Sequence, residues 1–166
     1  YMIEERMMLD AEVLRQGESI YGGVALNEVL LTRFNSLRTL NFQVYVNDTM
    51  LNEYSADGIL AATPTGSTAY SLSAGGPIAD PKAKMIILTP ICSHTINSRS
   101  IIFSPNDRIK IVAGSSEQLV ACDGESVLSL ERGDVISIRM SEHVARFIRL
   151  KEESFLHTLR QKMAYV

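Results

Sequence analysis

Apolar and polar residues alternate along much of the chain with the period of two that is typical of a half-buried β-strand. The clearest case is 40–46, where Leu40, Phe42 and Val44 are separated by single polar residues. The Asn47-Asp48 pair that follows tolerates the positive φ of a tight hairpin turn, and 50–54 is the expected partner strand. The pattern therefore predicts a β-hairpin over residues 40–54.

The same pattern recurs through the rest of the chain. Strands are expected at 2–14, 59–62, 85–88, 100–103, 108–113, 118–122, 126–130, 135–140 and 144–150. Turn residues separate many of them, as at 104–107, 123–124 and 133–134. A spacing of about ten residues between turns predicts a mainly β fold, an antiparallel two-sheet β-sandwich, rather than alternating βαβ units.

Two segments have a helical pattern instead. Residues 68–74 form a candidate short internal helix, with Ser67 or Thr68 placed to cap it and Gly-Gly-Pro at 75–77 to end it. Residues 152–163 form a longer C-terminal helix. Its apolar stripe recurs every four residues: Phe155, Leu159 and Met163. No long repeat or linker interrupts 1–150, which we expect to be one unit.

Composition and charge narrow the function classes. No stretch approaches the roughly 20 apolar residues of a membrane span, so membrane insertion is not expected. The formal charge of −3 gives no positive field to attract nucleic acid. Cys92 and Cys122 form no Cys-x-x-Cys pair and no secretory signal is present, which favours a reducing, cytoplasmic location. Because the chain starts at Tyr1 with a strand already under way, we expect it to be a piece of a longer protein.

The segment with the most chemical information is 57–78. A buried strand at 59–62 leads into a hydroxyl-rich turn, in which Pro64 fixes φ and Gly66 lets a ligand approach the main chain. Four hydroxyl groups are available there: Thr63, Thr65, Ser67 and Thr68. With the N-terminus of the following helix, they favour a nucleotide ligand. The alternative is a turn that only caps a helix, and neither a Walker loop nor a Gly-x-Gly-x-x-Gly motif is present.

These residues resemble a known family. Thr63-Pro-Thr-Gly-Ser-Thr-Ala-Tyr70, followed by Ser73-Ala-Gly-Gly-Pro-Ile78, closely resembles the signature of NAD kinases. Ala25-Leu-Asn-Glu28, upstream of Asp57-Gly58, resembles the Asn-Glu motif of that family. The resemblance continues through 102–105 and Asp123-Gly124 and covers essentially the whole chain as the C-terminal NAD-binding domain. It implies that the helix within 151–166 packs back on the N-terminal domain.

The resemblance also implies a set of NAD-binding residues: Asn27, Glu28, Asp57, Thr63, Thr65, Thr68, Ala69, Tyr70 and Ser73. Asn27 and Glu28 would read ribose hydroxyls, and residues 68–70 would grip adenine. Asp57 would reach the NAD site of an adjoining subunit, which implies a homodimer or homotetramer. From the residues alone, the Asn27-Glu28 pair could be a strand end, Tyr70 a core residue and Asp57 part of an Asp-Gly turn.

NAD kinases transfer the γ-phosphoryl group of ATP, or in some members of polyphosphate, to the 2′-hydroxyl of the adenosine ribose of NAD, assisted by magnesium. The catalytic Gly-Gly-Asp-Gly motif of the family lies in its N-terminal domain. Here Gly22-Gly23 is followed by Val24, so we predict no catalytic residue and no metal ligand in this chain. The resemblance therefore implies that the chain alone is inactive.

Three other interpretations remain open at this point. One is a non-catalytic nucleotide-binding module, and another is a lipid kinase of the diacylglycerol kinase type, which resembles NAD kinases in architecture. The third is a serine hydrolase that uses His94 and Asp123, although the chain has no Gly-x-Ser-x-Gly motif. Asp123-Gly124 alone predicts a hairpin turn.

Overall fold

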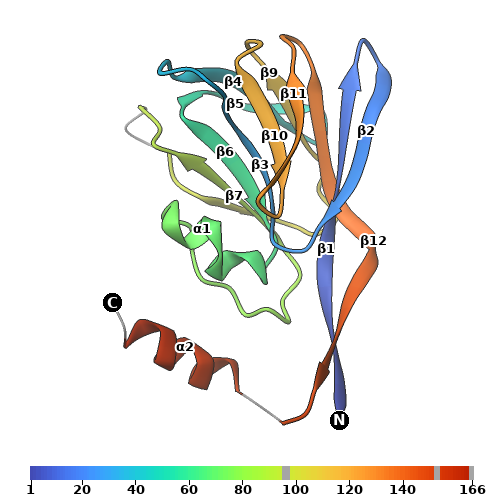
Figure 1. Ribbon diagram of the computed structural model, residues 1–166, viewed down its shortest axis with the longest axis vertical. Helices are drawn as coiled ribbons and strands as arrows, with labels where there is room; N and C mark the ends of the chain where they lie inside the picture. Colours follow the sequence, from blue (N-terminus) through green and yellow to red (C-terminus); the bar gives the residue numbers. More distant parts are fainter. Residues whose placement is uncertain (95–97, 152–153, 165–166) are drawn as a thin grey trace.

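The computed structural model describes residues 1–94, 98–151 and 154–164. The described chain forms two six-stranded antiparallel sheets, together with one 3₁₀ turn and two α-helices (Figure 1). The prediction of a mainly β, antiparallel two-sheet β-sandwich with a short internal helix and a C-terminal helix is thus confirmed.

The first sheet has the strand order β2-β1-β12-β9-β4-β5. Its strands are β1 (Met2–Arg15), β2 (Glu18–Ala25), β4 (Leu40–Val46), β5 (Thr49–Ala56), β9 (Ile109–Ala113) and β12 (Val135–Arg149). The second sheet has the order β11-β10-β3-β6-β7-β8. Its strands are β3 (Glu28–Arg33), β6 (Gly58–Ala62), β7 (Ile86–Ile91), β8 (Ile101–Phe103), β10 (Gln118–Cys122) and β11 (Glu125–Leu130).

The main core lies between the sheets and follows the alternation in the sequence. Leu40, Phe42 and Val44 of β4 are buried there, and the Phe42 ring stacks on Tyr54 of β5 with centroids 5.7 Å apart. The hairpin turns also follow the prediction. Asn47 and Asp48 both have positive φ, as do Asp123 and Gly124, which is the conformation of a type I′ turn.

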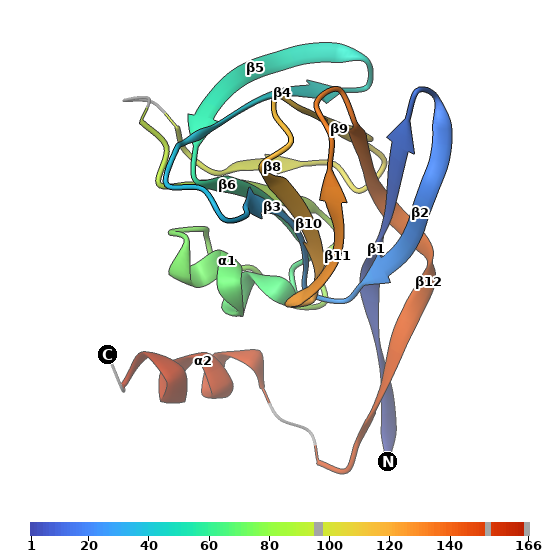
Figure 2. The ribbon, with the colours of Figure 1, turned by 45° about the horizontal axis from the view of Figure 1, so that its top comes forward.

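The second sheet is covered on its outer face as well, and this places the hydroxyl-rich segment. All five residues of β6 are buried. Leu60, Ala62 and Ile87 form a small cluster, against which Ala74 and Ala79 pack. The segment after β6 therefore lies over the outer face of this sheet, as Figures 1 and 2 show for α1 (Tyr70–Ser73).

Three predictions about elements need correction. Residues 135–140 and 144–150 are not two strands but one, β12, which pairs with β1 across an irregularity between Met7 and Leu9. The partners of these two residues, Val144 and Met140, are separated by three residues, which the ladder accommodates as a bulge. Two further strands lie where none was predicted: β2, an edge strand with two glycines, and β3, a short apolar run without alternation.

The third correction concerns the short helix at 68–74. The structure has a 3₁₀ turn, η1 (Gly66–Thr68), followed by the four-residue α1, and neither begins with a side-chain cap. The Ser67 hydroxyl donates instead to the Pro64 carbonyl (2.7 Å) and accepts from the Ala79 N–H (3.0 Å). A helix of one turn has too small a dipole to attract an anion at its N-terminus in the way that the sequence had indicated. The predicted end is confirmed, since Gly75 has a φ of 85°.

The C-terminal part leaves the sandwich. β1 and β12 stay paired from Leu14↔Val135 to Met2↔Arg149, and this ribbon extends beyond the other strands (Figure 1). Helix α2 (Phe155–Met163) follows and lies near α1 in both views (Figures 1 and 2). It was expected from residue 152, and residues 152–153 lie outside the described part. Among the described residues, no helix has the length and apolar character that a membrane crossing requires.

Candidate functional site

Two loops that are distant in sequence meet at one end of the second sheet. The first joins β2 to β3 and contains Asn27, and the second follows β6 and starts at Thr63. The Thr63 N–H donates to the Asn27 carbonyl (2.9 Å), and the Thr63 hydroxyl donates to the Leu26 carbonyl (2.5 Å). The same hydroxyl accepts from the Gly66 N–H (3.0 Å). Thr63 is fully buried and holds the two loops together, a position that offers a ligand no access to its side chain.

Gly66 is the point of closest approach between these loops. A Cβ built on Gly66 would lie 2.0 Å from the Asn27 carbonyl oxygen, a distance no side chain tolerates. The absence of a side chain therefore lets the loops touch through their backbones. The sequence predicted such a close approach at Gly66, but to a ligand rather than to a second loop.

Asp123 holds the first loop from its other side. One carboxylate oxygen, Oδ2, accepts from the Leu26 N–H (2.7 Å), and Oδ1 accepts from those of Asn27 (2.7 Å) and Glu28 (3.1 Å). The sequence predicted a hairpin turn at Asp123-Gly124, and the turn is present. The contact of Asp123 with the Asn-Glu motif could not be read from the sequence, because it crosses between strands that are 95 residues apart.

Glu28 is the most unusual side chain of the site. It is only 6% exposed, and its Oε2 oxygen has no hydrogen-bond partner among the described residues. Burial, and then the nearby negative charge of Asp123, raise the pKa of the Glu28 carboxyl above its ordinary value. A buried carboxylate oxygen without a donor is costly, and a ligand hydroxyl would satisfy it.

The residues of η1 and α1 that were predicted to contact NAD lie at or near the surface. Thr68 and Ala69 are half-buried, and Ser73 is exposed. Tyr70 is 43% exposed, so the alternative that it belongs to the core is wrong. These side chains are therefore accessible to a ligand, as Thr63 is not.

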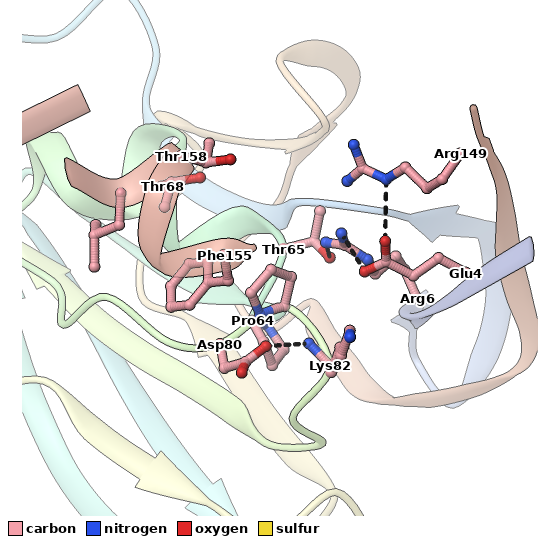
Figure 3. A pocket seen from close by; sticks show the side chains of 12 residues that line it. Glu4, Arg6, Pro64, Thr65, Thr68, Asp80, Lys82, Arg149, Phe155 and Thr158 are labelled. Atoms are coloured by element: carbon pink, nitrogen blue, oxygen red, sulfur yellow. Dashed lines mark hydrogen bonds and ion pairs between the residues drawn. The ribbon is translucent and has the colours of Figure 1, made fainter. Parts of the chain in front are cut away.

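A cavity of about 200 Å³ lies beside this surface (Figure 3). Among the predicted site residues it includes only Thr65 and Thr68; its other lining residues are Glu4, Arg6, Pro64, Asp80, Pro81, Lys82, Arg149, Phe155, Thr158 and Leu159. The charged residues around it were not predicted. Arg6, for example, is only 7% exposed, but its partners Glu4 and Thr65 are brought to it by the fold, and the alternation along β1 does not reveal this burial.

A partly buried charge network forms one wall of this cavity. Arg6 donates to the Thr65 hydroxyl (3.2 Å) and forms an ion pair with Glu4 (2.6 Å), which Arg149 also contacts (3.0 Å). Burial alone would raise the pKa of the Glu4 carboxyl, but hydrogen bonds and charge from Arg149 and Arg6 outweigh it, and the pKa is lowered. The network ties the β1–β12 ribbon to the hydroxyl-rich loop.

Helix α2 covers the opposite side of the cavity. Phe155 and Leu159 of the predicted stripe line it, together with Thr158 (Figure 3). Met163, the third stripe residue, is 62% exposed, and Leu156 is exposed as well. The stripe is therefore only partly covered within this chain.

Asp57 lies apart from the other predicted residues. It precedes β6 whereas Thr63 follows it, so about 20 Å of strand separates the two. Arg33 contacts the Asp57 carboxylate (3.4 Å). His94 lies at the same end, where its N–H donates to the Ser55 carbonyl (3.1 Å). Since Asp123 is at the other end, the hydrolase pair of His94 and Asp123 is not formed.

The described residues include no cluster of three His, Cys, Asp or Glu side chains that could hold a metal ion. The fold and its loops define a β-sandwich domain that presents a polar, partly accessible surface at one end of a sheet. The chain belongs to the ATP-NAD kinase C-terminal domain family, whose sequence pattern matches residues 26–150. This membership excludes the diacylglycerol-type lipid kinase.

Relatives and solved structures agree with this family. The chain is 46% identical over 178 residues to an NAD kinase of Lachnospira eligens and 42% identical over 165 residues to that of Carboxydothermus hydrogenoformans. Each match covers 98% of this chain but only 61% and 59% of those relatives.

Two solved structures share the fold. A yeast NADH kinase complexed with NADH superimposes with a TM-score of 0.92 at 30% identity, over 98% of this chain and 49% of that one. An NAD kinase from Archaeoglobus fulgidus in complex with ATP gives a TM-score of 0.82 at 26% identity, over 99% of this chain and 61% of that one.

Proposed function

We propose that this chain is the NAD-binding part of an NAD kinase, which transfers the γ-phosphoryl group of ATP, or a phosphoryl group of polyphosphate, to the 2′-hydroxyl of the adenosine ribose of NAD. The family and the similarity to NAD kinases support the class of reaction. Because the chain spans about three-fifths of the length of these relatives, the rest of the machinery belongs to an N-terminal domain.

The observation that carries the proposal is the buried, unpartnered oxygen of Glu28. A ribose hydroxyl of NAD would donate to it, with the Asn27 amide beside it. Thr68, Ala69 and Tyr70, which are accessible on η1 and α1, would contact the adenine, with Thr65 and Ser73 as polar neighbours. This arrangement would orient the adenosine half and leave the 2′-hydroxyl facing the phosphoryl donor.

Phosphoryl transfer depends chiefly on in-line positioning and on cations that offset the developing charge. This chain would contribute the first part of that work, by binding and orienting the acceptor. The N-terminal domain would hold the donor and supply the catalytic aspartate. In the present chain, the described residues offer no cluster of ligands for magnesium. We propose that the ion is held together with the phosphoryl donor.

Further parts of the proposal concern assembly and location. Asp57 and Thr63 lie at opposite ends of β6, and this separation supports a homodimer or homotetramer in which Asp57 reaches a neighbouring site. The exposed apolar residues of α2, Leu156 and Met163, would pack on the N-terminal domain. Both cysteines are free, in keeping with a cytoplasmic protein.

The test is a phosphorylation assay with NAD as acceptor and either ATP or polyphosphate as donor. We expect NADP from the full-length protein and none from the 166-residue chain alone. Full-length E28A serves as the control for the site and should lose most of the activity at low NAD concentration. Robust turnover by the isolated chain, or no NADP from the full-length protein, would refute the proposal.

A further inference from the structure

The loop that carries Asn27 and Glu28 is held by hydrogen bonds on both sides of its backbone. On one side, Thr63 donates hydrogen bonds to the carbonyl groups of Leu26 and Asn27. On the other, the Asp123 carboxylate accepts hydrogen bonds from the N–H groups of Leu26, Asn27 and Glu28. The polar backbone groups of the loop are thus occupied, while Asn27 is half-buried and the Oε2 oxygen of Glu28 has no partner among the described residues.

The bonds of Asp123 differ from those of an ordinary turn residue. An Asp at this position of a type I′ turn needs only to tolerate positive φ, and its φ is 50°. Here both carboxylate oxygens bond to the neighbouring loop instead, at 2.7 to 3.1 Å. The Asp123 N–H also donates to the Glu28 carbonyl (3.0 Å), which continues the ladder between β10 and β3.

We propose that Asp123 is a positioning residue for dinucleotide recognition: by clamping the backbone of residues 26–28, it sets where the Asn27 and Glu28 side chains meet the ribose. Hydrogen bonds from N–H groups to a carboxylate are stronger than neutral ones, and three of them leave the loop little freedom. This inference rests on the proposed function, since the ligand is the NAD of that proposal.

The informative variant is D123N in the full-length protein. Asn tolerates the left-handed backbone of this turn, so the hairpin is kept. Both carboxylate oxygens of Asp123 accept hydrogen bonds, and the amide nitrogen of Asn would face an N–H donor in place of one of them. The loop therefore loses at least one bond without losing the turn.

The matched control is D134N. Asp134 also accepts a backbone N–H in a turn, that of Glu131 (2.7 Å), and its carboxylate pairs with Arg15 (2.8 Å). It lies at the other end of β11 from Asp123 and does not contact residues 26–28. Any general loss of stability should appear in both variants, whereas a positioning effect should appear only in D123N.

Steady-state kinetics and amide hydrogen exchange together test the inference. We expect D123N to raise KM for NAD about tenfold, as one lost hydrogen bond to a charged group would, with KM for ATP unchanged and kcat altered less than KM. Exchange at the amides of 26–28 should become faster. D134N should leave KM and these amides unchanged, and D123E should restore part of the affinity. Combining D123N with E28Q should raise KM by less than the product of the two single effects, because Asp123 acts through Glu28.

Two results would overturn the inference while leaving the proposed function intact: an active D123N enzyme with the wild-type KM for NAD, or a loss of kcat with KM unchanged. Wild-type exchange rates at 26–28 in D123N would also overturn it. If the wild-type full-length protein formed no NADP, the proposed function itself would fall and this role of Asp123 with it.

Discussion

At the scale of single residues, Glu28 combines a cost to the stability of the fold with a proposed role in binding. Glu28 is buried with one oxygen unpartnered, next to a second carboxylate, Asp123. A buried polar atom without a partner destabilises a fold, and such atoms are expected where a ligand supplies the missing donor. We therefore expect Glu28 to give the chain a lower free energy of unfolding than a neutral residue would, and a higher affinity for NAD.

E28Q tests the binding half of this argument. Gln keeps the size of the side chain but replaces one carboxylate oxygen by an amide group, so a charge-assisted bond to a ribose hydroxyl is lost. We expect KM for NAD to rise about ten- to hundredfold in the full-length enzyme. Steady-state kinetics with NAD as the varied substrate measure this. An unchanged KM would remove Glu28 from the NAD site.

The same variant tests the stability half through its pH dependence. Because the pKa of Glu28 is raised in the folded state, its ionisation destabilises the fold, so the contribution of this one group to stability is greatest at low pH and falls as pH rises through the folded-state pKa. At neutral pH, E28Q should thus have a larger free energy of unfolding than the wild type. The difference should vanish as pH falls toward the ordinary value of 4.5. Urea unfolding of both chains across this range measures it; a constant difference would contradict the assignment.

G66A tests the contact between the two loops. The added methyl group would lie 2.0 Å from the Asn27 carbonyl, so the loops must separate, at a cost of about 1–3 kcal/mol in stability. NAD binding should weaken as well, because Asn27 moves. G22A is the control, since no atom lies within 4 Å of a Cβ at Gly22. Equal melting temperatures for G66A and G22A would show that the contact is unimportant.

At the scale of elements, the sequence predicts what depends on local pattern and fails where distant contacts decide. The hairpin over 40–54 and the turn at Asp123-Gly124 follow from alternation and turn chemistry, and both are present. The short helix predicted at 68–74 is present but covers only Tyr70–Ser73, and it lacks the predicted cap because Ser67 bonds to Pro64 and Ala79 instead. The clamp by Asp123 and the cavity beside Arg6 require pairings between strands that no local pattern specifies.

Helix α2 offers a prediction at this scale, because its apolar residues face two ways. Phe155 and Leu159 line the cavity, whereas Leu156 and Met163 are exposed. L156S combined with M163S should leave the stability of the isolated chain nearly unchanged. In the full-length protein the same pair should lower the melting temperature, because these residues would pack on the N-terminal domain. Equal effects in both contexts, or none in either, would contradict this packing.

At the scale of the whole molecule, the predicted NAD-binding residues lie at opposite ends of the second sheet. Asn27, Glu28 and the loop after β6 are at one end, and Asp57 is at the other. A single chain therefore cannot bring Asp57 and Glu28 to the same ribose. If Asp57 instead reaches the NAD site of an adjoining subunit, as proposed above, at least two copies of the protein must assemble.

Mixing two variants that are each impaired at low NAD concentration tests this assembly. In a mixed dimer of E28A and D57A subunits, one of the two sites would contain both Glu28 and Asp57 intact. We expect activity to reappear when the two full-length variants are unfolded and refolded together, and not when either is refolded alone. Failure to regain activity in verified mixed assemblies, or full activity of D57A by itself, would show that Asp57 does not act across subunits.

The most direct test of the account is a crystal structure of the full-length protein with NAD bound. We predict that a ribose hydroxyl of the adenosine half donates to the Glu28 carboxylate, and that the adenine lies against residues 68–70. Clear density for the adenosine at another place on the molecule, with the Glu28 oxygen still unpartnered, would contradict it.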